Sequence, residues 1–461
     1  MSDSGAVDAA VAQAEVINSP PAAGGGPAAA AGAVAEVEEA AARGGVLRNK
    51  DFAKLWAGES VSLIGTQVTQ FTMPLVAIIT LNATVFEVGV LNALRFVPVI
   101  ILSLFAGVWL DRRRRRPVLI GCALGNAVLI SLVPITSVTG VLSIGLLYVV
   151  VTLAGALSMT FDIGALSYVP SLVDREQLAQ GNSMIQASTA FAGVAGPGLA
   201  GILIGLVTAP ITLSVDAVSY LFSAAGLISI RKQEPAPEVP AERTTVWRSM
   251  AEGLRTVYGN SLLRAMLTQG TMMNLAFGIY ITVFVVYAVR TLGLTPLKLG
   301  IVMAAVAVGS LTGAMLAGRV KQALGLGRTM TITVILVSAA PFLLLIPHDA
   351  SAVAIAVLTF AHFSYGCNVT INNVHAITIR QVVTPPRLLG RMNASYRMVL
   401  FGSGPLGMIG GGLLGNALGL RTALVIAVIG MAVPVVWIFF SPVFRLKEMP
   451  EGPPAGTTER T

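Results

Sequence analysis

The sequence of 461 residues is 55% hydrophobic and only 11% charged. Soluble globular domains carry about 25% charged residues, so this composition excludes an ordinary water-soluble protein and indicates a chain solvated by lipid. The formal charge of +8 does not indicate nucleic-acid binding, because the arginines lie between apolar segments, where positive charge sets membrane topology. The 48 glycines and 24 prolines suit membrane helices, which pack closely through small residues.

Residues 1–46 consist mostly of Ala, Gly, Pro, Val and Glu, without the basic and apolar regions of a signal peptide. We expect this segment to be a disordered cytoplasmic extension. From residue 52 onward, apolar runs of about 20 residues, long enough to cross the hydrocarbon core, alternate with short polar breaks. The twelve membrane-spanning helices that we predict are 52–80, 86–110, 117–137, 142–166, 180–206, 211–230, 262–290, 297–319, 328–347, 351–378, 390–417 and 422–442.

The positive charges predict the orientation of these helices. One side of the membrane receives the arginine run 112–116 and most other Lys and Arg, whereas the other receives little beyond Arg290, Lys298 and Arg421. Because Lys and Arg accumulate on the cytoplasmic side, we expect both termini in the cytoplasm of a multi-pass protein of the cell (inner, cytoplasmic) membrane. The predicted units are an N-terminal six-helix half, 47–230, a cytoplasmic linker, 231–261, a C-terminal six-helix half, 262–444, and a cytoplasmic tail, 445–461.

The two halves repeat each other with a shift of 211 residues, as Gly89 and Gly300 illustrate (300 − 89 = 211). Six spans separate the copies, so the halves have the same orientation. Secondary transporters have such repeats, which rock around a substrate bound near midplane. We therefore predict an all-α membrane protein of two parallel six-helix repeats. Further matched pairs are Gly107 and Gly318, Leu178 and Leu389, Asn182 and Asn393, Gly196 and Gly407, and Gly201 and Gly412.

The break between the second and third spans carries a motif of one acid and five arginines, 107–116. It resembles the loop signature G-x-x-x-D-R-x-G-R-[RK] of the major facilitator superfamily, with Arg114 in place of the second Gly. The stretches 161–173, 193–201 and 388–394 are similar to motifs of the bacterial branch with macrolide-efflux and enterobactin-exporter proteins. The resemblance covers about 47–450 and implies the twelve-helix major facilitator fold. The residues that match the loop signature are Gly107, Asp111, Arg112, Arg115 and Arg116.

A gate is the more specific of two interpretations of this loop. Asp162 is expected at the cytoplasmic end of span four, where the helix dipole disfavours a carboxylate without a nearby cation. The resemblance implies that Asp111, an arginine of the run and Asp162 lock the two halves together on the cytoplasmic side. The alternative is a simple topology anchor. The internal repeat favours an asymmetric gate, because the counterparts of the two acids are Gln322 and Asn373 (111 + 211 and 162 + 211).

Three ionisable residues lie inside predicted spans, where a charge costs a few kcal/mol and marks a candidate functional site. Glu59 in span one and Arg95 in span two lie at depths that allow either a structural ion pair or a charge-coupling site. Asp216 in span six has no obvious cation in the sequence. It is either a proton site or a hydrogen-bonded packing residue.

Polar side chains at helical spacing mark spans one and ten, and aromatic and Met residues mark span seven. In the superfamily these helices line the central cavity, so the resemblance implies substrate contact. Interhelical hydrogen bonding is the alternative for the polar residues, and apolar packing for span seven. The candidate cavity residues are Gln67, Gln70, Tyr280, His362, Tyr365, Asn368 and Asn372.

Span five has small residues at a spacing that allows close helix packing, namely Gly193, Gly196 and Gly201, and Pro197 predicts a kink there. A role of this stretch in antiport rests on the resemblance alone.

The sequence has no ATP-binding P-loop, no metal-ligand cluster and no nucleophile elbow, so we expect neither an enzyme nor a cofactor. We predict a monomeric secondary transporter that exports a lipophilic small molecule, such as an antibiotic or siderophore, in exchange for protons. The alternatives are an importer of a small solute with the same fold and a non-transporting membrane sensor or scaffold.

Overall fold

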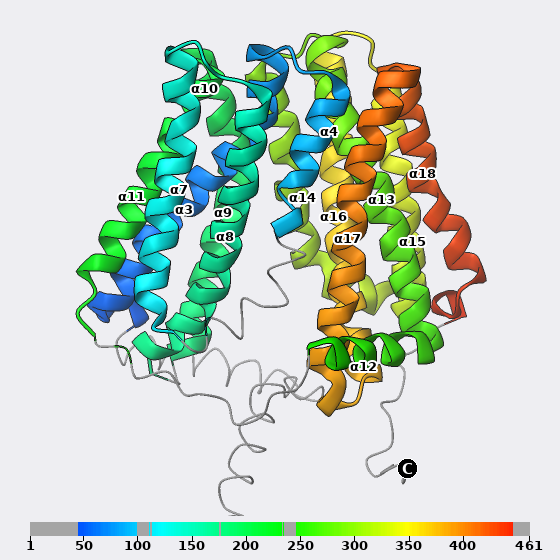
Figure 1. The fold of residues 1–461 in the computed structure, drawn as a ribbon. Helices are drawn as coiled ribbons and strands as arrows, with labels where there is room; N and C mark the ends of the chain where they lie inside the picture. Colours follow the sequence, from blue (N-terminus) through cyan, green and yellow to red (C-terminus); the bar gives the residue numbers. More distant parts are fainter. Residues whose placement is uncertain are drawn as a thin grey trace, which may run out of the picture.

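The computed structural model describes residues 45–98, 110, 113–174, 177–232, 234 and 246–445. Most of the predicted extension 1–46 and tail 445–461 lies outside these residues. Every regular element within the described ranges is a helix, and the helices form two bundles side by side (Figure 1). Among the described residues, eleven helical segments are long and apolar enough to cross a membrane. With α4, the described part of the remaining predicted span, they confirm the predicted all-α membrane architecture.

The helix bounds follow the predicted spans closely. In the first half they are α3 (Lys50–Leu75, extended by the π-helical Val76–Thr80), α4 (Val85–Leu94), α7 (Arg115–Val138), α8 (Ile144–Leu172), α9 (Leu178–Leu206), and α10 (Ala209–Thr212) with α11 (Ser214–Ser229). In the second half they are α13 (Ser261–Arg290), α14 (Pro296–Leu324), α15 (Leu326–Ala339, extended by the 3-10 helix Ala340–Leu345), α16 (Ala352–Val383), α17 (Leu389–Leu418) and α18 (Leu420–Phe440).

Three helices end later than their apolar runs. The predicted ends 166, 319 and 378 become Leu172 in α8, Leu324 in α14 and Val383 in α16. Backbone hydrogen bonds continue a helix through polar residues, whereas an apolar run stops at the first of them. The difference matters for Asp162, because it moves that residue from the expected helix end into the helix interior.

The internal repeat is confirmed at the level of single residues. Thr84 caps α4 by accepting a hydrogen bond from the N–H of Glu87 (3.2 Å), and Thr295 caps α14 in the same way from Lys298 (3.4 Å). The turns that precede these caps place Asn82 at φ 51° and Gly293 at φ 69°. Asparagine and glycine are the residues that adopt this left-handed conformation most readily. The caps and turns are both related by the shift of 211 (295 − 84 and 293 − 82).

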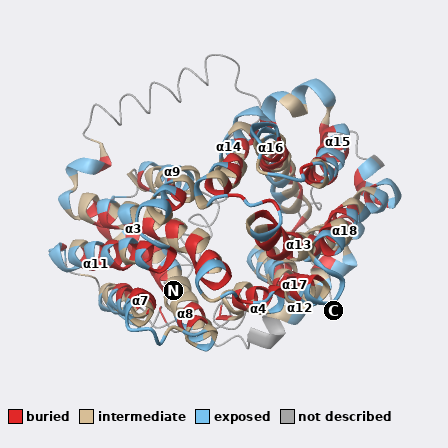
Figure 2. Ribbon diagram, turned by 90° about the horizontal axis from the view of Figure 1, so that it is seen from above, coloured by how far each residue is buried: buried red, intermediate tan, exposed pale blue. Residues whose placement is uncertain are grey.

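The two ends of the bundle differ. We call one end the linker face, because it carries α12 (Val246–Gly259), a helix within the 231–261 linker. This helix lies across the ends of the second half (Figure 1). The side chain of Glu252 in α12 forms an ion pair with Arg391 in α17, and Ser395 donates to the carbonyl of Met250 (3.1 Å). We call the other end the opposite face, and it carries the turns before α4 and α14. Figure 2 views the two bundles along their axes.

The halves meet through two glycine crossings related by the internal repeat. A Cβ at Gly89 in α4 would lie 2.5 Å from the carbonyl oxygen of Met408 in α17. The equivalent Cβ at Gly300 in α14 would lie 2.4 Å from the carbonyl oxygen of Pro197 in α9. Such separations leave no space for a side chain, so glycine allows the backbones to touch. Because Gly89 and Gly300 are each the fifth residue of a helix that begins at the opposite face, both crossings are nearer to that face.

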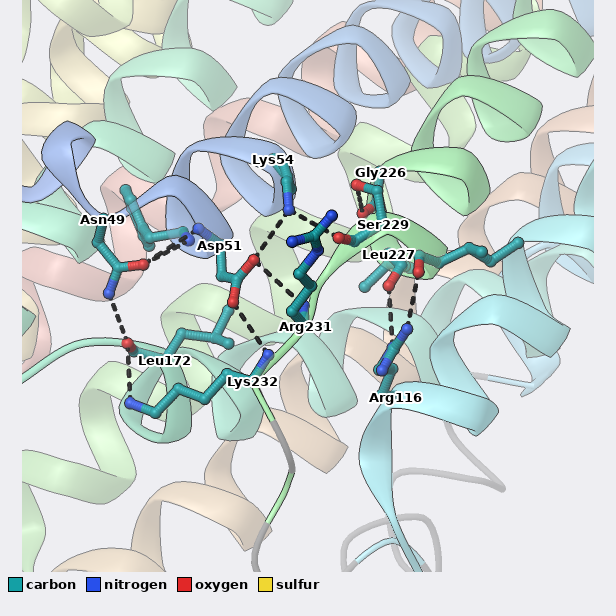
Figure 3. Close-up of polar contacts among 12 residues, drawn as sticks. Asn49, Asp51, Lys54, Arg116, Leu172, Gly226, Leu227, Ser229, Arg231 and Lys232 are labelled. Atoms are coloured by element: carbon teal, nitrogen blue, oxygen red, sulfur yellow. Dashed lines mark hydrogen bonds and ion pairs between the residues drawn. The ribbon is translucent and has the colours of Figure 1, made fainter.

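At the linker face, polar side chains tie the helix ends of the first half together (Figure 3). The carboxylate of Asp51 in α3 accepts from the backbone N–H groups of Arg231 (3.2 Å) and Lys232 (3.0 Å), just after α11. The carbonyl of Leu172, at the end of α8, accepts from Asn49 (2.7 Å) and from Lys232 (3.1 Å). These bonds satisfy backbone groups that helix ends leave open and fix three helices to one another.

Candidate functional site

A cavity of about 350 Å³ lies inside the first half. Its walls come mainly from α3, α4, α8 and α11, and every described lining residue belongs to the first half. Most ligand pockets combine apolar walls with a few polar groups, and this cavity has that character. The charged and most prominent polar lining residues are Glu59, Thr66, Gln67, Gln70, Arg95, Asp162, Asp216 and Tyr220.

Helix α3 supplies one continuous polar stripe to the cavity. Residues three and four apart share a helix face, and the lining positions of α3 follow that spacing. They are Glu59, Ser62, Leu63, Thr66, Gln67, Thr69, Gln70, Met73 and Pro74. The predicted cavity residues Gln67 and Gln70 therefore lie at the cavity wall together with Glu59.

Asp162 lies in the cavity rather than at the end of its helix. It is ten residues before the end of α8 (172 − 162), about 15 Å along the axis at 1.5 Å per residue. The expected position at the cytoplasmic helix end is therefore wrong. The other members of the predicted gate, Gly107, Asp111 and Arg112, lie outside the described residues. A gating role for the loop remains a prediction, and Asp162 has a second possible role in the cavity.

Arg95 is the one Lys or Arg among the described residues that line the same cavity as Asp162. The end of α4 lies close to the interior of α8, since a Cβ at Gly155 would lie 2.9 Å from the carbonyl oxygen of Arg95. Asp162, about two helical turns further along α8, is within range of electrostatic attraction by the guanidinium of Arg95. Glu59 lies close enough to Asp162 for the two carboxylates to repel each other. The three residues thus form one charged cluster at the cavity wall.

Glu59 has no basic partner among the described residues. The structural ion pair with Arg95 that the sequence allowed is not formed: no nitrogen of Arg95 lies within 4.0 Å of the Glu59 carboxylate. The Oε2 atom of Glu59 is buried and receives no hydrogen bond from any described residue. A buried oxygen without a donor is costly, so this atom is a candidate contact for a bound group.

Asp216 is the deepest of the cavity acids, with only 1% of its surface exposed. It lies in the first turn of α11, where the helix dipole favours negative charge. Ser219 donates to its backbone oxygen (2.8 Å) and lies 3.1 Å from its Oδ1, while Oδ2 has no partner among the described residues. No described Lys or Arg pairs with this carboxylate, as the sequence suggested.

A hydrogen-bond network that sequence reasoning missed joins four helices beside these acids. The hydroxyl of Tyr220 lies 3.0 Å from Thr66 Oγ1 in α3 and 3.3 Å from Ser158 Oγ in α8. Asn126 in α7 donates to the same Ser158 oxygen (3.3 Å). Tyr220 and Ser158 each lie four residues from an acid, Asp216 and Asp162. The sequence could have indicated this network, because both polar residues lie one helical turn from an intramembrane acid.

The predicted cavity residues of the second half lie elsewhere. Tyr280, His362 and Tyr365 line a separate apolar cavity of about 40 Å³ within the second bundle. The hydroxyl of Tyr280 and Nε2 of His362 are 2.7 Å apart, and Nδ1 of His362 is 2.8 Å from the carbonyl oxygen of Leu358. Both ring nitrogens of this histidine therefore have partners inside the protein.

The two predicted asparagines line neither cavity. Asn368 donates to the carbonyl of Ser364 in its own helix (2.9 Å). Asn372 donates to Thr333 Oγ1 (3.1 Å) and to the carbonyl of Met330 (3.3 Å), which joins α16 to α15. The contacts of Asn372 match the alternative of interhelical hydrogen bonding, whereas that of Asn368 stays within α16.

The glycines of α9 face two different neighbours. A Cβ at Gly196 would lie 2.4 Å from Cβ of Gln67 in α3, and one at Gly201 would lie 2.6 Å from the carbonyl oxygen of Pro296 in α14. A Cβ at Gly193 would have more space, since it would lie 3.7 Å from Cβ of Ala307. The stretch that includes Pro197 therefore joins the cavity wall to the second half.

Two arginines of the loop motif bind helix ends at the linker face. Arg116 donates from Nε to the carbonyl of Leu227 (3.0 Å) and from Nη2 to that of Ile228 (2.8 Å), which closes the end of α11 (Figure 3). The carboxylate of Glu234 accepts from the N–H groups of Arg115 (2.7 Å) and Arg116 (3.1 Å) at the start of α7. The side chain of Arg116 is thus part of the packing of the first half, whereas Arg115 bonds to Glu234 of the linker through its backbone N–H.

Comparisons with known proteins agree with this geometry. Residues 55–408 match the family model described as Major Facilitator Superfamily. The multidrug efflux pump Tap of Mycolicibacterium fortuitum is 26% identical over 410 residues, which cover 86% of this chain and 95% of Tap. Macrolide efflux protein A of Streptococcus pyogenes is 24% identical over 269 residues, which cover 58% of this chain and 66% of that protein.

Solved structures share the fold. The nucleoside transporter NupG superposes with a TM-score of 0.70 at 11% identity, covering 86% of this chain and all (100%) of NupG. A bacterial homologue of the iron transporter ferroportin in its inward-facing state gives 0.68 at 15% identity, covering 86% of this chain and 98% of that one. The family and these structures are transporters rather than enzymes. The chain is a multi-pass membrane transporter that belongs to the Major Facilitator Superfamily.

Proposed function

We propose that this transporter exports a lipophilic small molecule, such as an antibiotic or siderophore, by alternating access and in exchange for protons. The observation that carries the proposal is the 350 Å³ cavity with acids at membrane depth. Apolar walls suit a lipophilic substrate, and acids within membrane-spanning helices suit a proton-coupled cycle. The similarity to the efflux proteins Tap and macrolide efflux protein A supports export as the direction.

Alternating access requires the halves to separate where they now touch. The glycine crossings at Gly89 and Gly300 lie toward the opposite face. There the guanidinium of Arg290 in α13 also donates to the carbonyl of Ala83 in the first half (2.8 Å). We infer that these contacts close the opposite face and that substrate release there requires them to break.

Proton coupling is assigned to the cavity acids. Glu59 and Asp216 each have a carboxyl oxygen without a partner among the described residues. Arg95 lines the same cavity, and its positive charge attracts an ionised acid more strongly than a protonated one. A proton taken up by one of these groups changes the local charge by one unit. Such a change alters the affinity of the cavity for a charged substrate.

The proposed orientation follows the positive charges. Arg116, Arg391 and Lys232 lie at the linker face, so that face is assigned to the cytoplasm of the cell membrane, with both termini there. We propose a monomer as the working unit, because each half already surrounds its own cavity.

Proteoliposomes with an imposed pH gradient test this function. For protein inserted with its linker face outward, an acidic lumen is expected to drive a macrolide into the vesicle as protons leave. Accumulation that requires protons to move in the same direction as the substrate would support the importer instead. No gradient-dependent flux for any lipophilic substrate would favour a sensor or scaffold.

A further inference from the structure

The second half has almost no acids to pair with its basic residues. Between residues 261 and 445 the sequence has a single acidic residue, Asp349, and it is exposed in the turn before α16, at the opposite face. At the linker face Arg391 has an acid partner in Glu252 of α12. The remaining basic residues of the second half have no carboxylate of their own half at that face. An anion that neutralises them therefore comes from elsewhere.

Arg380 is half-buried near the linker-face end of α16. It is three residues before Val383, the last residue of that helix (383 − 380), about 4.5 Å along the axis. Its guanidinium carbon lies 4.2 Å from the ring centroid of Tyr396 in α17, so the cation stacks on an aromatic side chain. The Nε atom of Arg380 is buried and has no acceptor among the described residues. A buried donor without an acceptor is costly, so this atom is a candidate contact for a bound anion.

Arg397 adds a second positive charge beside Arg380. It follows Tyr396 in α17, its side chain is exposed, and it lies close enough to Arg380 for the two guanidinium groups to repel each other. Neither guanidinium forms an ion pair with an acid of the described residues. An anion between the two charges would replace this repulsion by attraction.

Arg397 lies on the side of α17 that is turned toward the first half. Residues 397, 401 and 408 are four and seven apart, so they share one helix face. On that face Met408 meets Gly89 of α4, and Arg397 is eleven residues nearer to the linker face (408 − 397), about 16 Å along the axis. The exposed side of the pair formed by Arg380 and Arg397 is thus away from the glycine crossing, where a ligand can reach it from the linker face.

We propose that Arg380 and Arg397 bind a phosphate group that approaches from the linker face. A carboxylate has two oxygens in one plane, which a single guanidinium can occupy, whereas the tetrahedral oxygens of a phosphate accept from guanidinium groups on two different helices. Basic pockets between membrane helices bind lipid headgroups in this way. The phosphate belongs either to an anionic phospholipid or to a soluble phosphorylated compound. The site goes beyond the proposed function, because neither export nor proton exchange requires it.

Ligand-dependent unfolding tests the site and separates the two sources of phosphate. A ligand that binds only the folded protein raises the unfolding midpoint. The full-length protein in neutral detergent is titrated with dioleoylphosphatidylglycerol, with glycerol phosphate, and with dioleoylglycerol, which has the same acyl chains without phosphate. A saturable rise with phosphatidylglycerol alone identifies a lipid headgroup, and a rise with glycerol phosphate as well identifies a soluble compound. No rise with either phosphate, or an equal rise with dioleoylglycerol, would overturn the proposal.

Variants assign the effect to the two arginines. Arg397→Gln is expected to raise the half-saturating concentration at least ~10-fold, as for one lost charge-assisted contact. Arg397→Lys keeps the charge without the planar fork and should raise it about 3-fold. Without phosphate, Arg397→Gln should be no less stable than the parent protein, because it removes one of two like charges. Arg380→Gln should weaken binding to a similar extent, and if that variant does not fold, the exposed Arg397 decides the question.

Arg328→Gln is the matched control, since it removes an exposed positive charge at the linker-face start of α15. Its half-saturating concentration should equal that of the parent protein. An equal loss of affinity in Arg328→Gln would indicate general attraction to a basic surface, and parental affinity in folded Arg397→Gln would remove Arg397 from the site. Either result would overturn the proposal. Binding is measured without a gradient, so the result does not depend on transport.

Discussion

The carboxylate of Asp216 in α11 lies directly against Gly65 of α3. A Cβ at position 65 would come within 2.6 Å of Oδ1 of Asp216 and within 2.2 Å of Oγ of Ser219. The absence of a side chain at Gly65 therefore lets the two helices approach and sets where the deepest cavity acid lies. This contact leads to the first of four predictions.

Gly65→Ala should destabilise the protein and displace Asp216. The added methyl group overlaps two side-chain oxygens, and such overpacking typically costs about 1–3 kcal/mol. Thermal unfolding in detergent should show a lower midpoint. Gly121→Ala in α7 is the control, because no heavy atom lies within 4 Å of its added Cβ. Equal midpoints for the two variants would show that Asp216 and Ser219 make room for the methyl group without loss of stability.

Gly300→Ala should weaken the closure of the opposite face. Its Cβ would lie 2.4 Å from the carbonyl oxygen of Pro197, so the two halves must move apart. A single cysteine at the cavity residue Asn92, with Cys122 and Cys367 replaced, reports access from that face. We expect an impermeant maleimide to label it roughly 3-fold faster in the variant, a modest shift in the population of open molecules.

The matched control is Gly410→Ala in α17, where an added Cβ meets no heavy atom within 4 Å. This variant should be labelled at the rate of the parent protein. Unchanged labelling of Gly300→Ala, with the control also unchanged, would show that the crossing at Gly300 does not limit access from the opposite face.

Tyr280→Phe should reduce stability without changing ligand binding in the first half. The change leaves Nε2 of the buried His362 without its partner at 2.7 Å, and an unsatisfied buried group costs about 1–3 kcal/mol. The unfolding midpoint should fall while gradient-driven macrolide uptake into proteoliposomes stays constant. A large loss of uptake would instead show that the cavity of the second half takes part in transport.

Arg116→Lys should fail to replace arginine at the linker face. The guanidinium uses two nitrogens, Nε and Nη2, to reach the carbonyls of Leu227 and Ile228, and an ammonium group lacks this fork. We expect both Arg116→Lys and Arg116→Met to lower stability by about 1 kcal/mol. If lysine restores the parent midpoint, the positive charge alone explains this position, as in a simple topology anchor.

The cavity shows which site features the sequence predicts well. Glu59, Arg95 and Asp216 were identifiable because a charge inside an apolar run is costly and rare. Gln67 and Gln70 followed from helical spacing. Tyr220 was missed, because a tyrosine in an apolar helix usually indicates packing rather than a hydrogen-bond network. Its role depends on Thr66 and Ser158, which come from other helices.

The sequence by itself determined the membrane class, the helix bounds to within a few residues and the repeat of the two halves. These properties depend on hydrophobic length, charge and local periodicity, which are read along one chain. Only the tertiary structure decided that Glu59, Asp162 and Asp216 line one cavity together with Arg95, and that His362 and Asn372 are used in packing. Which face of a helix meets which neighbour depends on contacts between distant residues, and neither composition nor spacing specifies those contacts.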